Sequence, residues 1–235
     1  MLDGCDINER IGMREIVLDT ETTGLSPRDG DRLVEIGCLE LINHMPTGET
    51  YHQYVNPRIP MPAAAEAVHG LSDKFLSDKP VFMDVVDDFL NFTGDAALVI
   101  HNASFDMGFI NAELTRLKRD PVPDDRAIDT VTMARKKFPG SPASLDALCR
   151  RFEIDNSART LHGALLDAEL LAEVYLELIG GRQPDLILGA ESSENAFTQA
   201  IKRVARAPRP HDPTAEELAA HAEFIARLND PMWKK

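Results

Sequence analysis

The spacing of hydrophobic and polar positions in the first 55 residues predicts three strands. The first is the apolar run that begins at Ile16 and leads into the polar residues 19–24, which is typical of a buried strand. Segments 33–42 and 50–55 predict two more strands, and turn-forming residues at 30–31 and 46–48 separate the three. Connections this short predict an antiparallel meander.

From residue 62 onward the spacing becomes helical, interrupted by two short strands at 97–100 and 127–130. In the segment 81–92, for example, Val85 and Phe89 fall on one helix face. The helical segments are predicted at 63–69, 72–76, 81–92, from the motif at 101–106 to about 117, and at 131–138, 144–152 and 163–179. Strands interleaved with helices indicate an α/β domain.

The pattern changes after Gly180-Gly181, where a helix ends and Pro184 follows. A polar, proline-containing stretch then precedes Thr214-Ala-Glu-Glu217, a capping box that predicts the start of a last helix. The predicted division of the chain is an N-terminal extension at 1–12, a globular domain at 13–181, a flexible linker at 182–213 and a helical tail at 214–235.

Composition indicates a globular protein with an ordinary core, since 43% of the residues are hydrophobic and 27% are charged. No apolar run approaches the roughly 20 residues that a membrane span needs. The N-terminus lacks the pattern of a signal peptide, and Cys5, Cys38 and Cys149 are far apart with no pairing motif. These features predict a cytoplasmic protein that does not contact a membrane.

The negative charge is concentrated in the globular domain. Residues 182–235 hold eight basic and eight acidic residues, so the remaining 17 basic and 31 acidic residues account for the whole net charge of −14. Long nucleic acids are bound mainly through Lys and Arg contacts to phosphates. A polyanionic substrate would therefore be held through metal ions or delivered by a partner.

Five residues could form a metal-dependent site. Asp19 and Glu21 lie two apart on a strand and so project to the same side, where paired acids need a cation. Asp106 begins a helix after a short strand, and Asp167 lies within the helix at 163–179. His162 precedes Asp167 by five residues, a rotation of about 500°, so it belongs in the loop before that helix.

Four carboxylates and one histidine suit two-metal phosphoryl transfer, in which two ions clamp the attacking water and the leaving oxygen. A histidine with its ordinary pKa of about 6.5 suits the general base. Oxygen ligands favour two Mg²⁺ or Mn²⁺ ions over zinc, and the sequence contains no Cys/His cluster.

The motifs DTETTG at 19–24, HNASFD at 101–106 and HGALLDA at 162–168 resemble those of the DEDDh family of 3′–5′ exonucleases. VHGL at 68–71 and ARKKFPGSPASLDALCRRF at 134–152 are similar, within it, to the epsilon proofreading subunits of bacterial DNA polymerase III. The resemblance implies a ribonuclease H-like, mixed five-stranded sheet flanked by helices, and exonuclease activity on a DNA 3′ end.

The resemblance also assigns roles to the five residues. It implies that Asp19 bridges both metal ions, that Glu21 and Asp167 complete one metal site, and that Asp106 serves the other largely through water. His162 is then the general base.

A substrate-binding set follows from the same resemblance. Residues 22–24 would meet the 3′ hydroxyl and Leu25 would wedge against the terminal base, which suits a single-stranded or frayed primer end. The implied substrate-binding residues are Thr22, Thr23, Gly24, Leu25, Val68, His69, Asn102 and Phe105.

The resemblance further implies that the tail docks on the alpha subunit of DNA polymerase III, as an amphipathic helix in a groove. Residues 193–197 lack the glutamine expected of a clamp-binding peptide, which argues against contact with a sliding clamp. Two other functions fit the sequence: an exoribonuclease of the same superfamily that trims RNA 3′ ends, and a mainly structural subunit that stabilises the polymerase.

Other polar residues near the motifs have simpler explanations. His101 and Asp129 are expected to be structural, and Asp146 to be an acid on a helix surface. His69 fits either packing at a helix end or contact with the nucleotide.

Overall fold

A computed structural model of the chain describes residues 12–157, 159–181 and 213–227. The chain divides into two units, Met1–Leu186 and Ile187–Lys235. The predicted N-terminal extension at 1–12 and linker at 182–213 lie almost wholly outside the described residues.

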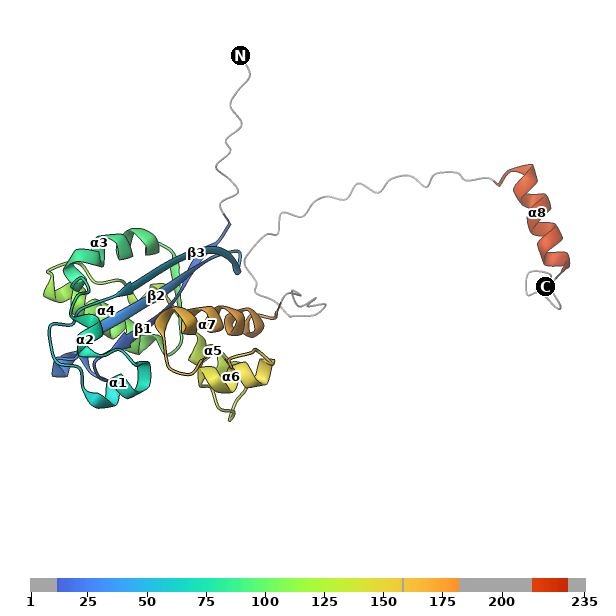
Figure 1. The fold of residues 1–235 in the computed structure, drawn as a ribbon. Coiled ribbons are helices and arrows are strands. Elements are labelled where there is room, and N and C mark those ends of the chain that lie inside the picture. The colour runs from blue at the N-terminus through green and yellow to red at the C-terminus, as the bar shows by residue number, and fades with distance from the viewer. Residues whose placement is uncertain (1–11, 158, 182–212, 228–235) are drawn as a thin grey trace, which may run out of the picture. The chain divides into compact units, whose positions relative to one another are not determined.

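A mixed five-stranded sheet forms the centre of the first unit, as predicted (Figure 1). β1 pairs antiparallel with β2 and parallel with β4, β2 pairs antiparallel with β3, and β4 pairs parallel with β5. The strand order is β3-β2-β1-β4-β5, with β1 at Arg14–Thr22, β2 at Leu33–Ile42, β3 at Met45–Tyr54, β4 at Ala97–Ile100 and β5 at Ala127–Asp129. Because β1, β4 and β5 are parallel, their carboxyl ends meet at one edge.

Helices pack on both faces of the sheet. Those of the first unit are α1 at Ala63–His69, α2 at Asp73–Leu76, α3 at Phe82–Thr93, α4 at Ala103–Arg116, α5 at Thr130–Lys137, α6 at Leu145–Phe152 and α7 at Ala164–Leu178, with short 3₁₀ helices η2 at Pro27–Asp29 and η3 at Asp124–Arg126. The predicted helical segments are therefore confirmed, with their ends shifted by a residue or two.

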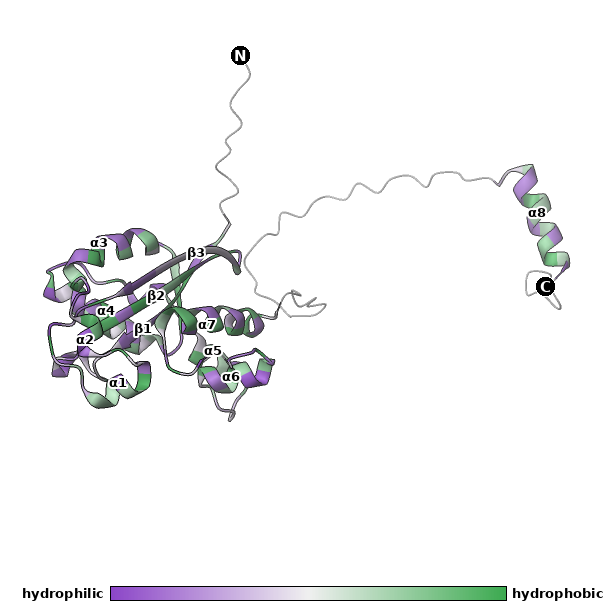
Figure 2. Ribbon diagram, viewed as in Figure 1, coloured by the Kyte–Doolittle hydropathy of each residue, from purple (hydrophilic) through white to green (hydrophobic). Residues whose placement is uncertain are grey.

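Strand β1 separates two hydrophobic clusters through its alternating side chains. Ile16 and Leu18 pack with residues of α3 and α4 in one cluster, whereas Val17 packs with residues of α6 and α7 in the other. Successive strand residues point to opposite faces, so Asp19 and Glu21 follow Val17 toward α7, and Thr20 faces α4. Figure 2 shows hydrophobic colour along β2 and polar colour along the edge strand β3.

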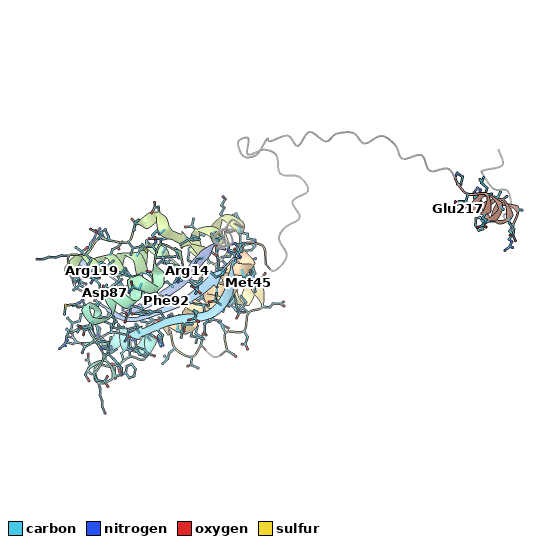
Figure 3. The ribbon with its side chains drawn as sticks, turned by 90° about the horizontal axis from the view of Figure 1, so that it is seen from above. Arg14, Met45, Asp87, Phe92, Arg119 and Glu217 are labelled. Atoms are coloured by element: carbon cyan, nitrogen blue, oxygen red, sulfur yellow. The ribbon has the colours of Figure 1, made fainter. Side chains whose placement is uncertain are left out.

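Arg14 links the start of β1 to neighbouring elements. Its guanidinium donates to the carbonyl of Phe92 at 2.7 Å and pairs with Glu40 of β2 at 2.6 Å, and Figure 3 shows Arg14 beside Phe92. The end of α3 is thereby attached to the antiparallel half of the sheet.

The hairpin between β2 and β3 differs from the prediction. Its turn lies at Asn43 and His44, whose φ angles are 52° and 65°, and not at residues 46–48. Two positive φ angles suit the twist of a two-residue hairpin. Gly48, with φ of 91°, lies where the pairing shifts between Leu39 and Leu41, so the turn-forming residues produce a bulge inside a longer strand.

In the second unit, the described residues form helix α8 at Ala215–Ala226. Thr214 and Glu217 make the predicted capping box, in which each side chain accepts from the backbone N–H of the other. Leu218 and Phe224 are exposed apolar residues on this helix. No helix in the described part of the chain is long and apolar enough to cross a membrane.

Candidate active site

A cavity of about 850 Å³ lies where the carboxyl ends of the parallel strands meet the start of α7. Residues from β1, α1, α4, α6, α7 and the loop before α7 line it. The cavity brings together all five residues predicted for catalysis and all eight predicted for substrate binding. Side chains separated by almost 150 residues in sequence thus share one site.

Three of the predicted residues form a tight group. Ligand atoms of Glu21, His162 and Asp167 all lie within 4.8 Å of one another. Glu21 reaches the group because it is on the β1 face that α7 covers, and Asp167 is in the first turn of α7, where the helix dipole favours a negative charge. Asp167 is almost fully buried, at 2% exposure.

Asp106 enters the site from the opposite side of the sheet. It lies in the first turn of α4, whose N-cap residue Asn102 has a left-handed backbone with φ of 66°. The hydroxyl of Thr20 donates to Asp106 at 2.7 Å. Thr20 therefore orients Asp106 from the strand that carries Asp19 and Glu21.

Burial raises the pKa of three of these acids, and repulsion between carboxylates adds to the shift for Asp19 and Glu21. Burial raises the pKa of Glu21 to about 8, with the charges of Asp167, Glu35 and Asp106 adding to the shift. Burial also raises the pKa of Asp106 to about 7, although the Thr20 hydrogen bond opposes it. The pKa of Asp19 is raised well above its ordinary value by burial and then by Asp106, Glu21 and Asp167.

This set of side chains fits hard divalent cations. Several carboxylates converge in a poorly hydrated place where their shared charge is unfavourable, and a divalent ion would relieve the repulsion. The four acids and His162 supply mainly oxygen donors, and no cysteine is among the described residues that line the cavity. That composition favours Mg²⁺ or Mn²⁺ over Zn²⁺.

His162 lies in the loop before α7, as predicted. Its side chain is 48% exposed, and its backbone N–H donates to the carbonyl of Val68 on α1 at 3.1 Å. Nδ1 of His162 lies 3.8 Å from Oδ2 of Asp167. The loop is thus attached to α1, while the imidazole remains open to the cavity.

Arg159 was missed by the sequence reasoning. Its guanidinium donates to both carboxylate oxygens of Asp167, at 2.5 and 2.6 Å, and to Asp146 at 2.9 Å. Its pKa is raised, above all by the hydrogen bonds to Asp167, so it stays charged. A basic residue three positions before His162, in a domain poor in positive charge, was the available signal.

The loop after β1 forms one wall of the cavity. The Thr22 hydroxyl donates to the carbonyl of Gly24 at 2.6 Å, and the Thr23 hydroxyl accepts from the backbone N–H of Arg32 at 3.0 Å. A Cβ at Gly24 would lie 2.3 Å from the carboxylate of Asp31, so a side chain there would displace this packing. Leu25 is 86% exposed and free to contact a ligand.

Val68, His69, Asn102 and Phe105 also line the cavity. Val68 is exposed, while His69 is buried and Phe105 packs against Phe109 with ring centroids 5.0 Å apart. Nδ1 of His69 accepts from the backbone N–H of Leu71 at 3.0 Å, and Nε2 has no hydrogen-bond partner among the described residues. Burial lowers the pKa of His69, which keeps its ring neutral.

Three further polar residues can now be assigned. Asp129 is structural, because its carboxylate accepts from Thr132 and from the N–H groups of Val131 and Asn102. His101 lines the cavity, with Nδ1 2.9 Å from the hydroxyl of Thr130. Asp146 was expected to be only a helix-surface acid, but it lines the cavity and pairs with Arg159.

Comparison with known protein families matches residues 16–175 to the family described as Exonuclease. Over 222 residues, the chain is 50% identical to the DNA polymerase III subunit epsilon of Rickettsia felis, which covers 92% of this chain and 97% of that one. It is 47% identical over 221 residues to the DNA polymerase III subunit epsilon of Escherichia coli K12, covering 88% and 90%.

Solved structures give a similar result. A structure of Exonuclease X in complex with 5′ overhanging duplex DNA is 27% identical, with a TM-score of 0.56 over 70% of this chain and 90% of that one. The nuclease domain of 3′hExo, a DEDDh family member bound to rAMP, is 16% identical, with a TM-score of 0.62 over 72% and 93%. The latter likeness concerns the fold alone.

Proposed function

This chain belongs to the exonuclease family, among the epsilon subunits of DNA polymerase III, and on that premise we propose how its cavity acts on DNA. The activity is removal of nucleotides from a DNA 3′ end as proofreading for the replicative polymerase. The proposed chemistry is hydrolysis of the last phosphodiester bond with two divalent ions, releasing a nucleoside 5′-monophosphate. The observation that carries it is the convergence of four acids and His162 in one cavity.

Four side chains would hold the ions. Asp19 interacts electrostatically with Asp106 of α4 and with Asp167 of α7, so it would contribute its carboxylate to both ions. Glu21 and Asp167 would complete one metal site, and Asp106 would serve the second. Bound there, Mg²⁺ or Mn²⁺ would stabilise the charge that develops on the phosphate and on the leaving 3′ oxygen.

His162 would take the proton of the attacking water. A general base must be within hydrogen-bond reach of that proton and able to release it again to solvent. The half-exposed imidazole of His162, on a loop beside Glu21 and Asp167, meets both requirements.

The cavity walls would hold the terminal nucleotide. Residues 22–24 present polar groups for the 3′ hydroxyl, and the exposed Leu25 would separate the terminal base from its neighbour. Val68, His69, Asn102 and Phe105, which also line the cavity, would contact the base and sugar. Apolar stacking accepts any base, so mismatched ends are favoured because they fray more readily.

The proposal divides the chain by function, which is supported by its separation into two units. The nuclease would occupy 13–181, and α8 would dock the tail at 214–235 on the alpha subunit of the polymerase. Residues 182–213 would act as a tether that keeps the nuclease near the primer end at high local concentration.

The test compares three labelled substrates: single-stranded DNA, a duplex with a mispaired 3′ end, and RNA. With Mg²⁺, DNA should be degraded from the 3′ end to monophosphates, the mispaired duplex faster than a paired one, and chelator should stop the reaction. Faster trimming of RNA than of DNA would overturn the proofreading function.

Matched variants test the site itself. Asp19→Ala and Asp167→Ala should abolish cleavage and leave the circular dichroism spectrum unchanged. Asp87→Ala is the control, since Asp87 pairs with Arg119 outside the cavity. Normal turnover by Asp19→Ala or Asp167→Ala would contradict the proposed metal site.

A further inference from the structure

Arg159 is bound to the carboxylate that is proposed as a metal ligand. Nε of Arg159 lies 2.5 Å from Oδ1 of Asp167, and Nη2 lies 2.6 Å from Oδ2. This two-point contact engages both oxygens of Asp167, and the Arg159 side chain is only 9% exposed. A guanidinium and a carboxylate paired in this way form one of the stronger hydrogen-bonded ion pairs in proteins.

The Asp167 carboxylate cannot keep both hydrogen bonds to Arg159 and also coordinate a divalent ion. A divalent ion held by Glu21 and Asp167, whose ligand atoms lie within 4.8 Å of each other, must coordinate an oxygen of Asp167. Each of those oxygens accepts a short hydrogen bond from Arg159, and the two positive charges would repel each other at such a distance. Metal binding therefore competes with the Arg159–Asp167 pair.

Arg159 also contacts the proposed general base. Its Nη2 lies 3.2 Å from Nδ1 of His162, so the guanidinium faces two groups that the reaction needs. Arg159 sits in the loop that also carries His162, and no helix or strand includes it. A long side chain on such a loop can change partners without moving the sheet or α7.

A nucleotide phosphate bound in the cavity would be an alternative anionic partner for Arg159. Of the described residues that line it, Arg159 is the only arginine or lysine. A nucleotide phosphate in this acidic domain has no other positively charged side chain within the cavity. Once an ion neutralises Asp167, the phosphate of the substrate becomes the favoured partner of the guanidinium.

We propose that Arg159 is a positioning residue that exchanges partners. It holds Asp167 and His162 in place before the ions bind, yields Asp167 to the incoming ion, and then binds the phosphate of the terminal nucleotide. The inference rests on the proposed metal site. It adds a reason why Asp167 and His162 are held in place before the metal ions bind.

The first experiment measures Mn²⁺ binding to the full chain without DNA, by electron paramagnetic resonance of free Mn²⁺. Removing the competing cation in Arg159→Gln should tighten Mn²⁺ binding about tenfold, within the range expected for charge-assisted hydrogen bonds. Arg159→Lys keeps the charge but loses the two-point contact, and should give a smaller gain. Arg119→Gln is the control, because it breaks an exposed pair with Asp87 outside the cavity (Figure 3).

The second experiment measures binding of thymidine 5′-monophosphate in saturating Mn²⁺, by calorimetry. Arg159→Gln should weaken this binding about tenfold, while Arg119→Gln leaves it unchanged. Arg159→Gln should therefore bind Mn²⁺ more tightly and the nucleotide more weakly, whereas Arg119→Gln changes neither; a general structural defect would not produce this pair of opposite effects.

The outcomes separate the two proposals. Equal or weaker Mn²⁺ binding by folded Arg159→Gln, or unchanged nucleotide binding, would overturn the partner exchange. If Arg159→Gln does not fold, Arg159→Lys decides, and Mn²⁺ affinity equal to that of the native chain would overturn it. Failure of the native chain to bind Mn²⁺ at all would instead overturn the proposed metal site.

Discussion

Glu21 and Asp106 are acids in surroundings that disfavour their charge. Each is nearly inaccessible to solvent, and each lies near other carboxylates of the cavity. An enzyme that binds cations must keep such a repulsive group together before the ions arrive. Here Thr20 supports Asp106 by a hydrogen bond and Arg159 supports Asp167 by an ion pair.

The raised pKa values predict how stability depends on pH. With pKa raised to about 8 for Glu21 and about 7 for Asp106, the folded state binds protons that the unfolded state has released. Their contribution to stability is complete below about pH 4 and is lost as pH rises through about 7 to 8. In the presence of a chelator, the melting temperature should therefore decrease as the pH is raised from 5 to 8.5.

Two comparisons check this prediction. Glu21→Gln should flatten the fall, because the amide does not ionise, whereas Asp87→Asn on an exposed surface should leave it unchanged. Mn²⁺ should restore much of the loss at pH 8.5 by binding the ionised acids. A melting temperature that stays constant or rises over this pH range would show that the pKa values of these acids are not raised in the folded state.

His162 carries a separate prediction about rate. His162→Ala should lower the cleavage rate by about 10²–10⁴, the usual contribution of a general base. Mn²⁺ affinity should change far less than in Asp167→Ala, because several carboxylates remain. Loss of metal binding as severe as in Asp167→Ala would make His162 a ligand and not the base.

At the level of elements, the site depends on how closely α7 approaches the sheet. Gly37 of β2 lies opposite Asp19 in the antiparallel pair, and a Cβ there would lie 2.2 Å from the carbonyl carbon of Ala164 at the start of α7. The absence of a side chain at Gly37 therefore allows the first turn of α7, with Asp167, to reach β1.

This close approach predicts that Gly37→Ala displaces the start of α7. We expect a loss of stability of about 1–3 kcal/mol, the usual cost of overpacking, together with weaker Mn²⁺ binding and slower cleavage. Gly108→Ala is the matched control, since it lies within α4 with open space around its Cβ position and should be neutral or slightly stabilising. Chemical denaturation and the Mn²⁺ titration check both variants. Native-like stability in Gly37→Ala would mean that α7 is not constrained by the strand.

At the level of the whole molecule, the negative charge of the nuclease unit disfavours binding of long DNA through phosphate contacts. All of the net charge of −14 belongs to the first 181 residues. Its cavity has room for a terminal nucleotide, and the described residues that line it include a single cationic arginine. We therefore expect long DNA to be presented by the polymerase on which the tail is proposed to dock.

A truncation tests this arrangement. Deleting residues 208–235 should leave degradation of single-stranded DNA unchanged and abolish association with the alpha subunit, measured by gel filtration of the mixed subunits. Within α8, Leu218→Gln should weaken association, because it removes an exposed apolar contact. Glu223→Gln is the control, because Glu223 lies on a different face of α8 from Leu218. If the truncated chain still associates with the alpha subunit, the docking segment lies outside residues 208–235.

The sequence by itself determined the elements and the chemical character of the site. Hydrophobic periodicity located the strands and helices because burial of one face is repeated at a fixed spacing. The acids stood out because Asp19 and Glu21 lie two apart on a strand and Asp106 begins a helix. Local turn geometry was less accessible. The residues at 46–48 favour a turn, yet strand pairing extends through them as a bulge, and the hairpin turns at Asn43 and His44.

Only the tertiary structure decided which charges meet. The partner of Asp167 is Arg159, whose long side chain reaches across the loop and back to the first turn of α7. The approach of α7 to Gly37 likewise joins elements distant in sequence. Periodicity records which residues are buried, whereas a contact between two side chains depends on the packing of whole elements. The raised pKa values of the acids, and the partner exchange proposed for Arg159, follow from that packing.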